Sequence, residues 1–212
     1  QQDYDVLVNF AYDWLPFYLT PFLQRPIAHL VSMGALSAVM DEAIGRVAAQ
    51  FPGTIGVHSF AQAQTFPFAS ACRCLGNGLD LSLYRYHPSP QHYLGWVGRI
   101  APEKGLEDAM EAIVETQSLL KIWGKVEDNA YWQGIQTRFA SAPFIYEGFL
   151  PTAELQAALG HCRALLMTPH WVEAFGNVAI EALACGVPVI AYDRGGPREI
   201  VESGVTGWLV EP

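Results

Sequence analysis

The sequence predicts an α/β fold built on parallel sheets, and the second part of the chain carries that prediction. From residue 93 onward, short apolar runs alternate with longer stretches of helical periodicity. Parallel strands need such crossover helices, and strands covered on both faces are apolar throughout rather than alternating. Glycine or proline closely follows several of the runs, as is typical of tight turns between a strand and a helix.

The elements of this region can be placed in order. The predicted strands cover residues 93–97, 119–123, 144–146, 164–168, 187–191 and 208–210. The predicted helices cover residues 106–116, 130–138, 152–159, 177–184 and 198–202. Thr152 follows Pro151 and offers a helix N-cap. Residues 93–212 are therefore expected to form a Rossmann-like domain.

Residues 1–76 repeat the pattern less completely and predict part of a second Rossmann-like domain. Strands are expected at 6–10, 27–31 and 55–58, and a helix with an apolar stripe is expected at 37–50. Residues 77–92 are rich in glycine, proline and turn-forming residues, which predicts a connection between the two domains.

Composition excludes several classes of function. The net charge of −9, with 12 Lys and Arg among 212 residues, disfavours nucleic acid or an anionic membrane as the main partner. No apolar run reaches the roughly 18–20 residues that span a bilayer. Residues 1–5 lack the basic start of a signal peptide, and the four cysteines fit no zinc or disulfide spacing. We therefore expect buried thiols in a cytoplasmic protein.

Candidate ligand-binding residues lie where the predicted strands end. Ligands of open parallel sheets bind at the carboxyl ends of the strands. Gly98, Gly124 and Gly148 stand at or next to three of these ends, and glycine lets a ligand approach the backbone closely. Ordinary tight turns remain the alternative explanation for each of them.

Two cations follow the strand at 93–97. Arg99 and Lys104 stand five residues apart, just before a helix whose start adds amide donors and partial positive charge. Two cations at such a place suit a diphosphate. The alternative is a pair of solvated loop side chains.

Two glutamates frame the start of the helix at 177–184. Glu173 precedes it, and Glu181 lies about two turns inside among apolar neighbours. A carboxylate in such surroundings needs a partner, and ribose hydroxyls are one, because a carboxylate accepts two hydrogen bonds. A glutamate on a wet helix face, or one paired with arginine, is the alternative. Residues 175–177 are expected to supply free amides at the helix start, a second anion site.

These motifs, in this order and spacing, resemble the retaining GT-B glycosyltransferases of family four, the glycosyl transferases group 1. The resemblance runs from residue 77 to residue 210. It includes the two cations, the two glutamates with seven residues between them, the segment 184–190 and the Gly-Gly-Pro turn at 195–197. It implies the GT-B fold, in which two Rossmann-like domains flank the active site.

The resemblance also implies roles for individual residues. Arg99 and Lys104 match the pair that grips the donor diphosphate, Glu173 matches the carboxylate at the transferred sugar, and Glu181 matches the ribose-binding carboxylate. Further donor contacts are implied for Gly98, Gly148, Phe149, Leu150, Phe175, Gly176, Asn177 and Val178. The family needs no divalent metal and no cofactor, so the expected ligands are a nucleotide sugar, with UDP-glucose as the first choice, and a small acceptor.

The sequence departs from the family pattern in its first domain and at its end. The opening strands with their glycine-rich loop, and the last helices, find no match, so we expect a preceding part of the same enzyme to be required. The family often has a histidine after a central strand of the first domain. Ser32 falls at about that point, with His29 three residues earlier, and both are candidates for the acceptor side.

Six aromatic residues crowd the start of the chain and leave the acceptor open. They are expected either to pack in the core and between domains or to form a stacking wall for a flat acceptor; they are Phe10, Tyr12, Trp14, Phe17, Tyr18 and Phe22. Residues 10–16 and 29–34 are also similar to cyanobacterial glucosyltransferases that act on tetrahydrobiopterin from UDP-glucose. The alternatives are an epimerase or phosphorylase of the same fold, or a non-catalytic module that binds nucleotide sugars.

Overall fold

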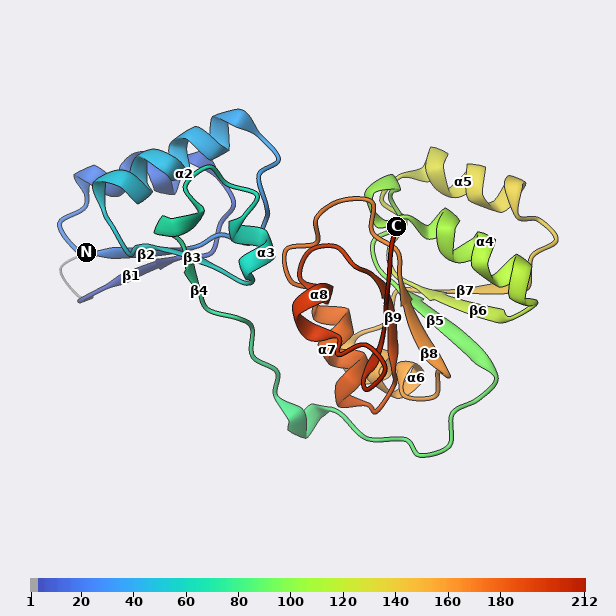
Figure 1. Ribbon diagram of the computed structural model, residues 1–212. Helices are drawn as coiled ribbons and strands as arrows, with labels where there is room; N and C mark the ends of the chain where they lie inside the picture. The colour runs from blue at the N-terminus through green and yellow to red at the C-terminus, as the bar shows by residue number, and fades with distance from the viewer. Residues whose placement is uncertain (1–3) are drawn as a thin grey trace. The chain divides into compact units, whose positions relative to one another are not determined.

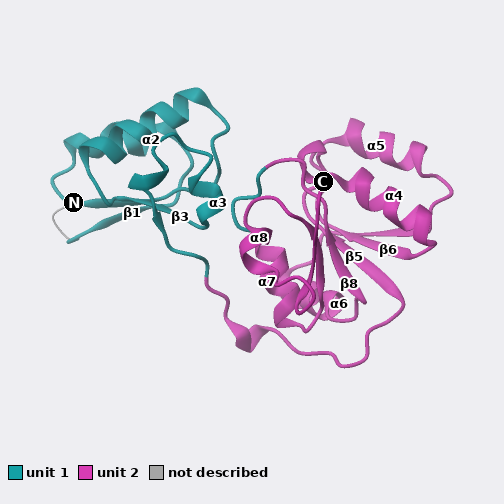
Figure 2. Cartoon of the chain, in the orientation of Figure 1, with its two compact units in different colours: residues 1–77, 172–175 teal, residues 78–171, 176–212 magenta. Residues whose placement is uncertain are grey.

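The computed structural model describes residues 4–212 and divides them between two compact units (Figure 2). Unit 1 contains the described residues up to Asn77 together with Val172–Phe175, and unit 2 contains Gly78–Trp171 and Gly176–Pro212. Residues 1–3 lie outside the described residues. They belong to the start of the chain that lacks the basic residues of a signal peptide.

Unit 2 is built on a six-stranded parallel sheet with the strand order β10-β9-β8-β5-β6-β7. Its strands are β5 (Tyr93–Val97), β6 (Leu119–Trp123), β7 (Phe144–Gly148), β8 (Ala164–Met167), β9 (Val189–Tyr192) and β10 (Gly207–Val210). Its helices are α4 (Leu106–Thr116), α5 (Asn129–Arg138), α6 (Thr152–Leu159), α7 (Asn177–Ala184) and α8 (Pro197–Ile200). The predicted α/β fold with parallel sheets is confirmed.

Apolar residues cover both faces of this sheet. On one face α4 and α5 pack against β5 and β6, around buried side chains that include Trp96, Met110 and Ile122. On the other face α6 and α7 pack around Leu159, Leu165 and others, and Figure 1 shows the two helix pairs on opposite sides of the strands. Burial on both faces explains why the strands are apolar throughout.

The order of the strands changes direction between β5 and β8. From β5 the chain proceeds to β6 and β7 on one side, and then returns to place β8 on the other side of β5. The segments that follow β5 and β8 therefore lead to helices on opposite faces of the sheet, α4 and α7. Open α/β sheets bind ligands in the crevice at such a switch point.

Unit 1 contains a four-stranded parallel sheet with the order β1-β2-β3-β4. Its strands are β1 (Leu7–Asn9), β2 (Ile27–Leu30), β3 (Ile55–Val57) and β4 (Arg73–Cys74), and its helices are α1 (Trp14–Leu19), α2 (Ala38–Gln50) and α3 (Phe60–Ala63). The sequence pattern did not predict β4, α1 or α3. Asp13 caps α1 by accepting from the Leu15 amide at 2.9 Å, and Pro16 is tolerated because it lies in the first turn.

The stretch expected to connect the domains is packed along unit 2 from Gly78 onward. The His87 amide donates to the carbonyl of Cys185 at 3.3 Å, and the Gln91 amide donates to the carbonyl of His161 at 2.8 Å. These two hydrogen bonds hold the segment before β5 against unit 2.

Two further properties follow from the described part of the chain. All four cysteines are free thiols; Cys162 and Cys185 are buried, and Cys72 and Cys74 are partly buried. Burial raises the pKa of Cys162 to about 12, so this thiol is inert. Within residues 4–212, no helix is both long enough and apolar enough to cross a membrane.

Candidate active site

Glycines bring three strand-end loops of unit 2 into contact. A side chain on Gly124, whose φ is 144°, would place its Cβ 1.8 Å from the carbonyl oxygen of Gly98. The Gly124 amide donates to the carbonyl of Gly148 at 2.9 Å, and Gly148 has a φ of 78°. The close approach therefore requires glycine at Gly124, and it joins the loops after β5, β6 and β7.

A cavity of about 280 Å³ opens between these loops. Its lining is mostly apolar and includes the predicted donor contacts Gly98, Phe149 and Leu150; the other lining residues are Val97, Arg99, Trp123, Gly124, Lys125 and Leu155. The Lys125 ammonium lies 4.8 Å from the centre of the Phe149 ring. The cavity therefore combines a flat aromatic wall with two cations at its edge.

Arg99 and Lys104 lie in the loop between β5 and α4, at the switch point. Arg99 is about half exposed and pairs with Glu103 at 2.9 Å and with Glu127. The Lys104 ammonium lies 4.7 Å from the centre of the Trp171 ring, and the Arg99 guanidinium carbon lies 5.8 Å from the same centre. One aromatic ring therefore lies within reach of both predicted diphosphate ligands.

The backbone beside Lys104 is tightly enclosed. Gly105 adopts a left-handed conformation (φ 61°) and caps the start of α4. An added Cβ would lie 1.9 Å from the carbonyl oxygen of Thr168 and 2.8 Å from the His170 ring. The loops after β5 and β8 consequently touch at a point where only glycine fits.

Helix α7 begins on a second left-handed glycine. Gly176 has a φ of 96°, and its Cβ position would lie 3.2 Å from Pro197 and 3.4 Å from Met167. Asn177 and Val178 are the first residues of α7, where backbone amides have no acceptor within the helix. The amides at the start of α7 are therefore the candidates for the second anion site, which stays a prediction.

Glu181 lies half-buried on α7 and has a partner within unit 2. The Tyr84 hydroxyl donates to Glu181 Oε1 at 3.4 Å. Burial raises the pKa of Glu181, and the hydrogen bond from Tyr84 lowers it in part. The carboxylate is therefore desolvated yet able to accept further hydrogen bonds.

Glu173 belongs to the segment Val172–Phe175, which is grouped with unit 1. The Ser59 hydroxyl donates to the carbonyl oxygen of Ala174 at 2.6 Å, which fixes the backbone beside Glu173. Glu173 and Phe175 are thus described within unit 1, whereas Arg99, Lys104 and Glu181 are described within unit 2.

The two acceptor-side candidates differ in exposure. His29 is 1% exposed in the core of unit 1, stacks on Phe17, and contacts Asn9 at 3.1 Å and Thr20 at 2.9 Å. Burial lowers the pKa of His29 to about 4, so it is neutral and structural. Ser32 is exposed after β2, at the carboxyl edge of the sheet.

The aromatic cluster of unit 1 divides into packed and exposed members. Phe17 is buried and Tyr12 packs against the same core. Trp14, Tyr18 and Phe22 are at least half exposed and line a groove of about 390 Å³ between α1 and α2. Phe17 and Tyr12 thus pack in the core as expected, whereas a stacking wall for a flat acceptor stays a prediction for the exposed members.

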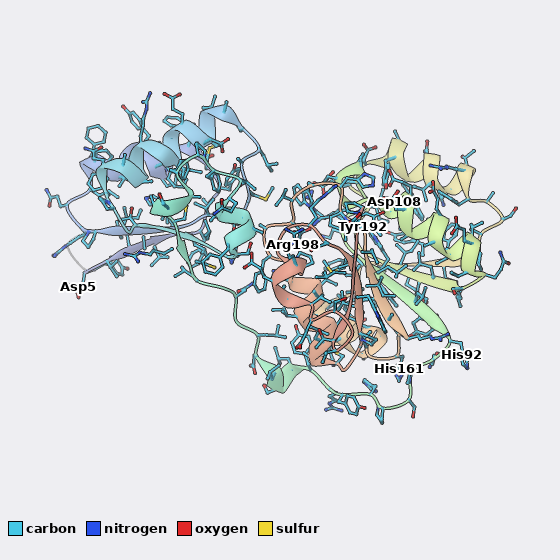
Figure 3. The ribbon with its side chains drawn as sticks, in the orientation of Figure 1. Asp5, His92, Asp108, His161, Tyr192 and Arg198 are labelled. Atoms are coloured by element: carbon cyan, nitrogen blue, oxygen red, sulfur yellow. The ribbon has the colours of Figure 1, made fainter. Side chains whose placement is uncertain are left out.

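Sequence patterns missed a polar cluster that joins α4, the loop after β8 and the end of β9 in unit 2. Asp108 accepts from the Tyr192 hydroxyl at 2.6 Å and lies 2.8 Å from His170 Nε2; Figure 3 labels Asp108 and Tyr192. The three residues are far apart in the sequence and share no motif, so only the fold brings them together. Within the described residues 4–212, no group of three or more His, Cys, Asp or Glu side chains is placed to hold a metal ion.

Comparison with known proteins places these features in a family. The family model described as glycosyl transferases group 1 matches residues 86–212. The chain is 34% identical to the 2-deoxystreptamine glucosyltransferase of Streptomyces kanamyceticus over 56% of this chain and 32% of that protein. It is 35% identical to the GDP-mannose-dependent alpha-mannosyltransferase of Mycolicibacterium smegmatis over 59% of this chain and 32% of that protein. The aligned part spans about a third of each relative.

Solved structures extend the likeness of fold to nearly the whole chain. HepE of Anabaena, solved in complex with UDP and glucose, superposes with a TM-score of 0.87 at 23% identity, covering 99% of this chain and 65% of HepE. Sucrose-phosphate synthase of Thermosynechococcus elongatus superposes with a TM-score of 0.82 at 20% identity, covering 99% of this chain and 61% of that chain. At these identities the likeness establishes the fold, and the chain spans less than two thirds of each neighbour.

Proposed function

We propose, from the premise that this chain belongs to the glycosyl transferases group 1 family, that it is the donor-binding part of a retaining glucosyltransferase. The proposed donor is UDP-glucose and the proposed acceptor carries a hydroxyl. The observation that carries the proposal is the meeting of Arg99 and Lys104 at the switch point of the unit 2 sheet, beside the cavity at Gly98. The complex of HepE with UDP and glucose supports the choice of donor.

The two cations supply the main catalytic effect in this proposal. When the bond between the sugar and the diphosphate breaks, negative charge develops on the diphosphate and positive charge on the anomeric carbon. Arg99 and Lys104 stabilise the first of these charges from fixed positions, which lowers the barrier. Because they replace a divalent cation, the reaction is expected to need neither metal nor cofactor.

The rest of the donor is assigned to the cavity and to α7. The base would lie against Phe149 and Leu150, near the backbone of Gly148, and Glu181 would accept from the ribose hydroxyls. Its half-buried carboxylate already takes a hydrogen bond from Tyr84, which supports its ability to bind hydroxyls. Amides at Gly176 and Asn177, at the start of α7, would contact the sugar and the phosphates.

Glu173 is proposed to orient the transferred sugar rather than to form a covalent bond with it. The acceptor would attack from the side that the diphosphate leaves, so the configuration at the anomeric carbon is retained. The hydrogen bond from Ser59 to Ala174 supports a fixed position for this loop.

A pterin such as tetrahydrobiopterin is the proposed acceptor, on the sequence similarity of residues 10–16 and 29–34. Ser32 is the exposed candidate for its contact. The Gln62 amide donates to the carbonyls of Val31 (2.7 Å) and Met33 (2.9 Å), which holds Ser32 in place between them. The free thiols accord with a reducing compartment, so we place the enzyme in the cytoplasm.

The proposal is tested by UDP binding to this chain and by turnover of UDP-glucose in the complete enzyme. Arg99→Ala and Lys104→Ala should each weaken UDP binding and raise the free-energy barrier to transfer by about 2–4 kcal/mol, because each removes a preorganised charge. Binding of UDP by both variants at the parent level would refute the diphosphate assignment.

Product analysis separates the proposal from its alternatives. Transfer of glucose should require an acceptor, over a panel that includes tetrahydrobiopterin, and it should survive EDTA. Turnover of the donor without an acceptor would instead indicate an epimerase, and donor binding without any turnover would indicate a non-catalytic module. Loss of activity on chelation, restored by Mn²⁺ or Mg²⁺, would overturn metal-independent transfer.

A further inference from the structure

Trp171 contacts the two cations of the proposed diphosphate site from a different loop. Its ring lies in the segment after β8, whereas Arg99 and Lys104 lie after β5. The distances of 4.7 Å to the Lys104 ammonium and 5.8 Å to the Arg99 guanidinium carbon are within the range of about 6 Å at which an indole face attracts a cation. Arg99 and Lys104 therefore both contact the same aromatic ring.

The Trp171 ring offsets the electrostatic repulsion between Arg99 and Lys104. Two cations that converge on one diphosphate repel each other before the ligand arrives. Glu103 and Glu127 already hold Arg99, but a carboxylate also repels the incoming diphosphate. An aromatic ring attracts both cations through its quadrupole and carries no net charge, so it does not oppose the anion.

The loop before Trp171 is fixed to the loop that carries the cations. The Thr168 hydroxyl donates to the carbonyl of Gly105 at 2.6 Å. The His170 amide donates to the carbonyl of Glu103 at 3.0 Å. The indole is therefore anchored directly beside the residues that precede and follow Lys104.

Side chains complete this anchor. Arg194 donates to the carbonyl of His170 at 2.5 Å. The His170 ring lies 2.8 Å from Asp108, which also accepts a hydrogen bond from the Tyr192 hydroxyl. Asp108 and Tyr192 are labelled in Figure 3. Asp108 of α4 and Arg194 after β9 thus both contact His170, the residue next to Trp171, and the ring is placed by more than its own contacts.

We propose that Trp171 is a positioning residue that holds Arg99 and Lys104 side by side as a preformed grip for a nucleoside diphosphate. This inference rests on the proposed function. It assigns to the indole face, and not only to the two charges, part of the affinity for the diphosphate.

The test compares binding of UDP and UMP by calorimetry in the full 212-residue chain. Trp171→Leu removes the aromatic face and should weaken UDP binding about 10-fold, while UMP binding weakens no more than about 3-fold. Trp171→Phe keeps an aromatic face and should stay within about 3-fold of the parent for UDP. Trp208→Leu, at an exposed tryptophan of β10 in unit 2, is the matched control and should bind UDP as the parent does.

Each contrary result has a distinct meaning. UDP binding by Trp171→Leu at the parent level would overturn the inference and leave the proposed function standing, provided that Arg99→Ala and Lys104→Ala still lose affinity. Equal weakening of UDP and UMP, or equal failure of the Leu and Phe variants, would also overturn it, since either points to loop damage or shape. A parent chain without affinity for UDP would refute the proposed function and the inference with it.

Discussion

The two units are both parallel sheets, yet they use their polar side chains in opposite ways. Five polar side chains are buried in the described part of the chain, and all belong to unit 1: Asn9, Thr20, His29, Ser59 and Gln62. In unit 2 the charged side chains are instead at least partly exposed, whether in loops, on helices or, as with the Lys121–Glu147 pair, in strands β6 and β7. A buried polar side chain of unit 1 is therefore held by partners within the unit, whereas we expect some of the charged loop residues of unit 2 to contact a ligand.

Topology explains part of this difference. The described strands of unit 1 follow one another in chain order across the sheet, whereas those of unit 2 reverse their direction of addition at β5. Neighbouring loops diverge only where the order reverses, and a crevice forms there. The three predictions that follow test this division, beginning with the largest effect.

Gly105→Ala should damage unit 2 most. The new Cβ would lie 1.9 Å from the carbonyl oxygen of Thr168, at a φ of 61°. We expect the free energy of unfolding to fall by more than about 3 kcal/mol and UDP binding to be lost. Thermal denaturation and calorimetry measure the two effects.

Gly134→Ala is the matched control for this substitution. Gly134 lies within α5 with no atom near its Cβ position, so alanine should stabilise the helix by about 0.5–1 kcal/mol. If Gly105→Ala were as well tolerated as Gly134→Ala, the enclosed contact between the two loops would be wrong.

Acid should weaken unit 1 through His29. The pKa of this side chain is about 4 in the folded unit against about 6.5 when unfolded, so the unfolded state binds more protons between these values. Stability is therefore fully present above about pH 6.5 and falls as the pH drops toward 4, by up to about 3 kcal/mol. The measurement is amide exchange at β1 to β3 across this range.

A non-titrating variant isolates the contribution of His29. His29→Gln is expected to lower stability at neutral pH but to flatten its dependence on pH between about 4 and 6.5. The carboxylates titrate in both parent and variant, so the difference between the two pH dependences of stability reports on His29 alone. The same slope in parent and variant would mean that His29 is not held neutral.

The two glutamates should fail differently, with effects of about 10-fold. Glu181→Gln should mainly raise the apparent KM for the donor, because ribose contacts are equal in the ground and transition states. Glu173→Gln should mainly lower kcat, because its contact with the sugar strengthens as charge develops. Kinetics with varied donor and saturating acceptor measure both, and small, equal effects would make both carboxylates structural.

Sequence patterns predicted most of the fold, and their failures have physical causes. In unit 2, α4, α6 and α7 have the predicted bounds, because apolar periodicity and glycine turns mark them clearly. In unit 1 the patterns missed α1, which is short and contains Pro16, and β4, which has only two residues. Elements of that size depend on tertiary packing rather than on local preference.

The candidate site was predictable only as far as its residues lie in motifs. Arg99 and Lys104 share one loop, so their spacing marked them as candidates for a diphosphate, and the family resemblance implied that role. Asp108 on α4, Trp171 after β8 and Tyr192 at the end of β9 lie far apart in the sequence, which by itself gives no sign that they converge. Burial of His29 was equally invisible, since an active-site histidine and a core histidine have the same local sequence.

The central claim is that unit 2 holds the grip on the nucleotide diphosphate, and titration of the isotope-labelled chain with UDP tests it most directly. NMR amide shifts should change in the loops at 98–105, 124–125, 148–150 and 168–171 and at the start of α7, while the amides of β1 to β4 stay unchanged. Shifts that saturate with UDP in the strands of unit 1, with residues 98–105 unaffected, would contradict the account.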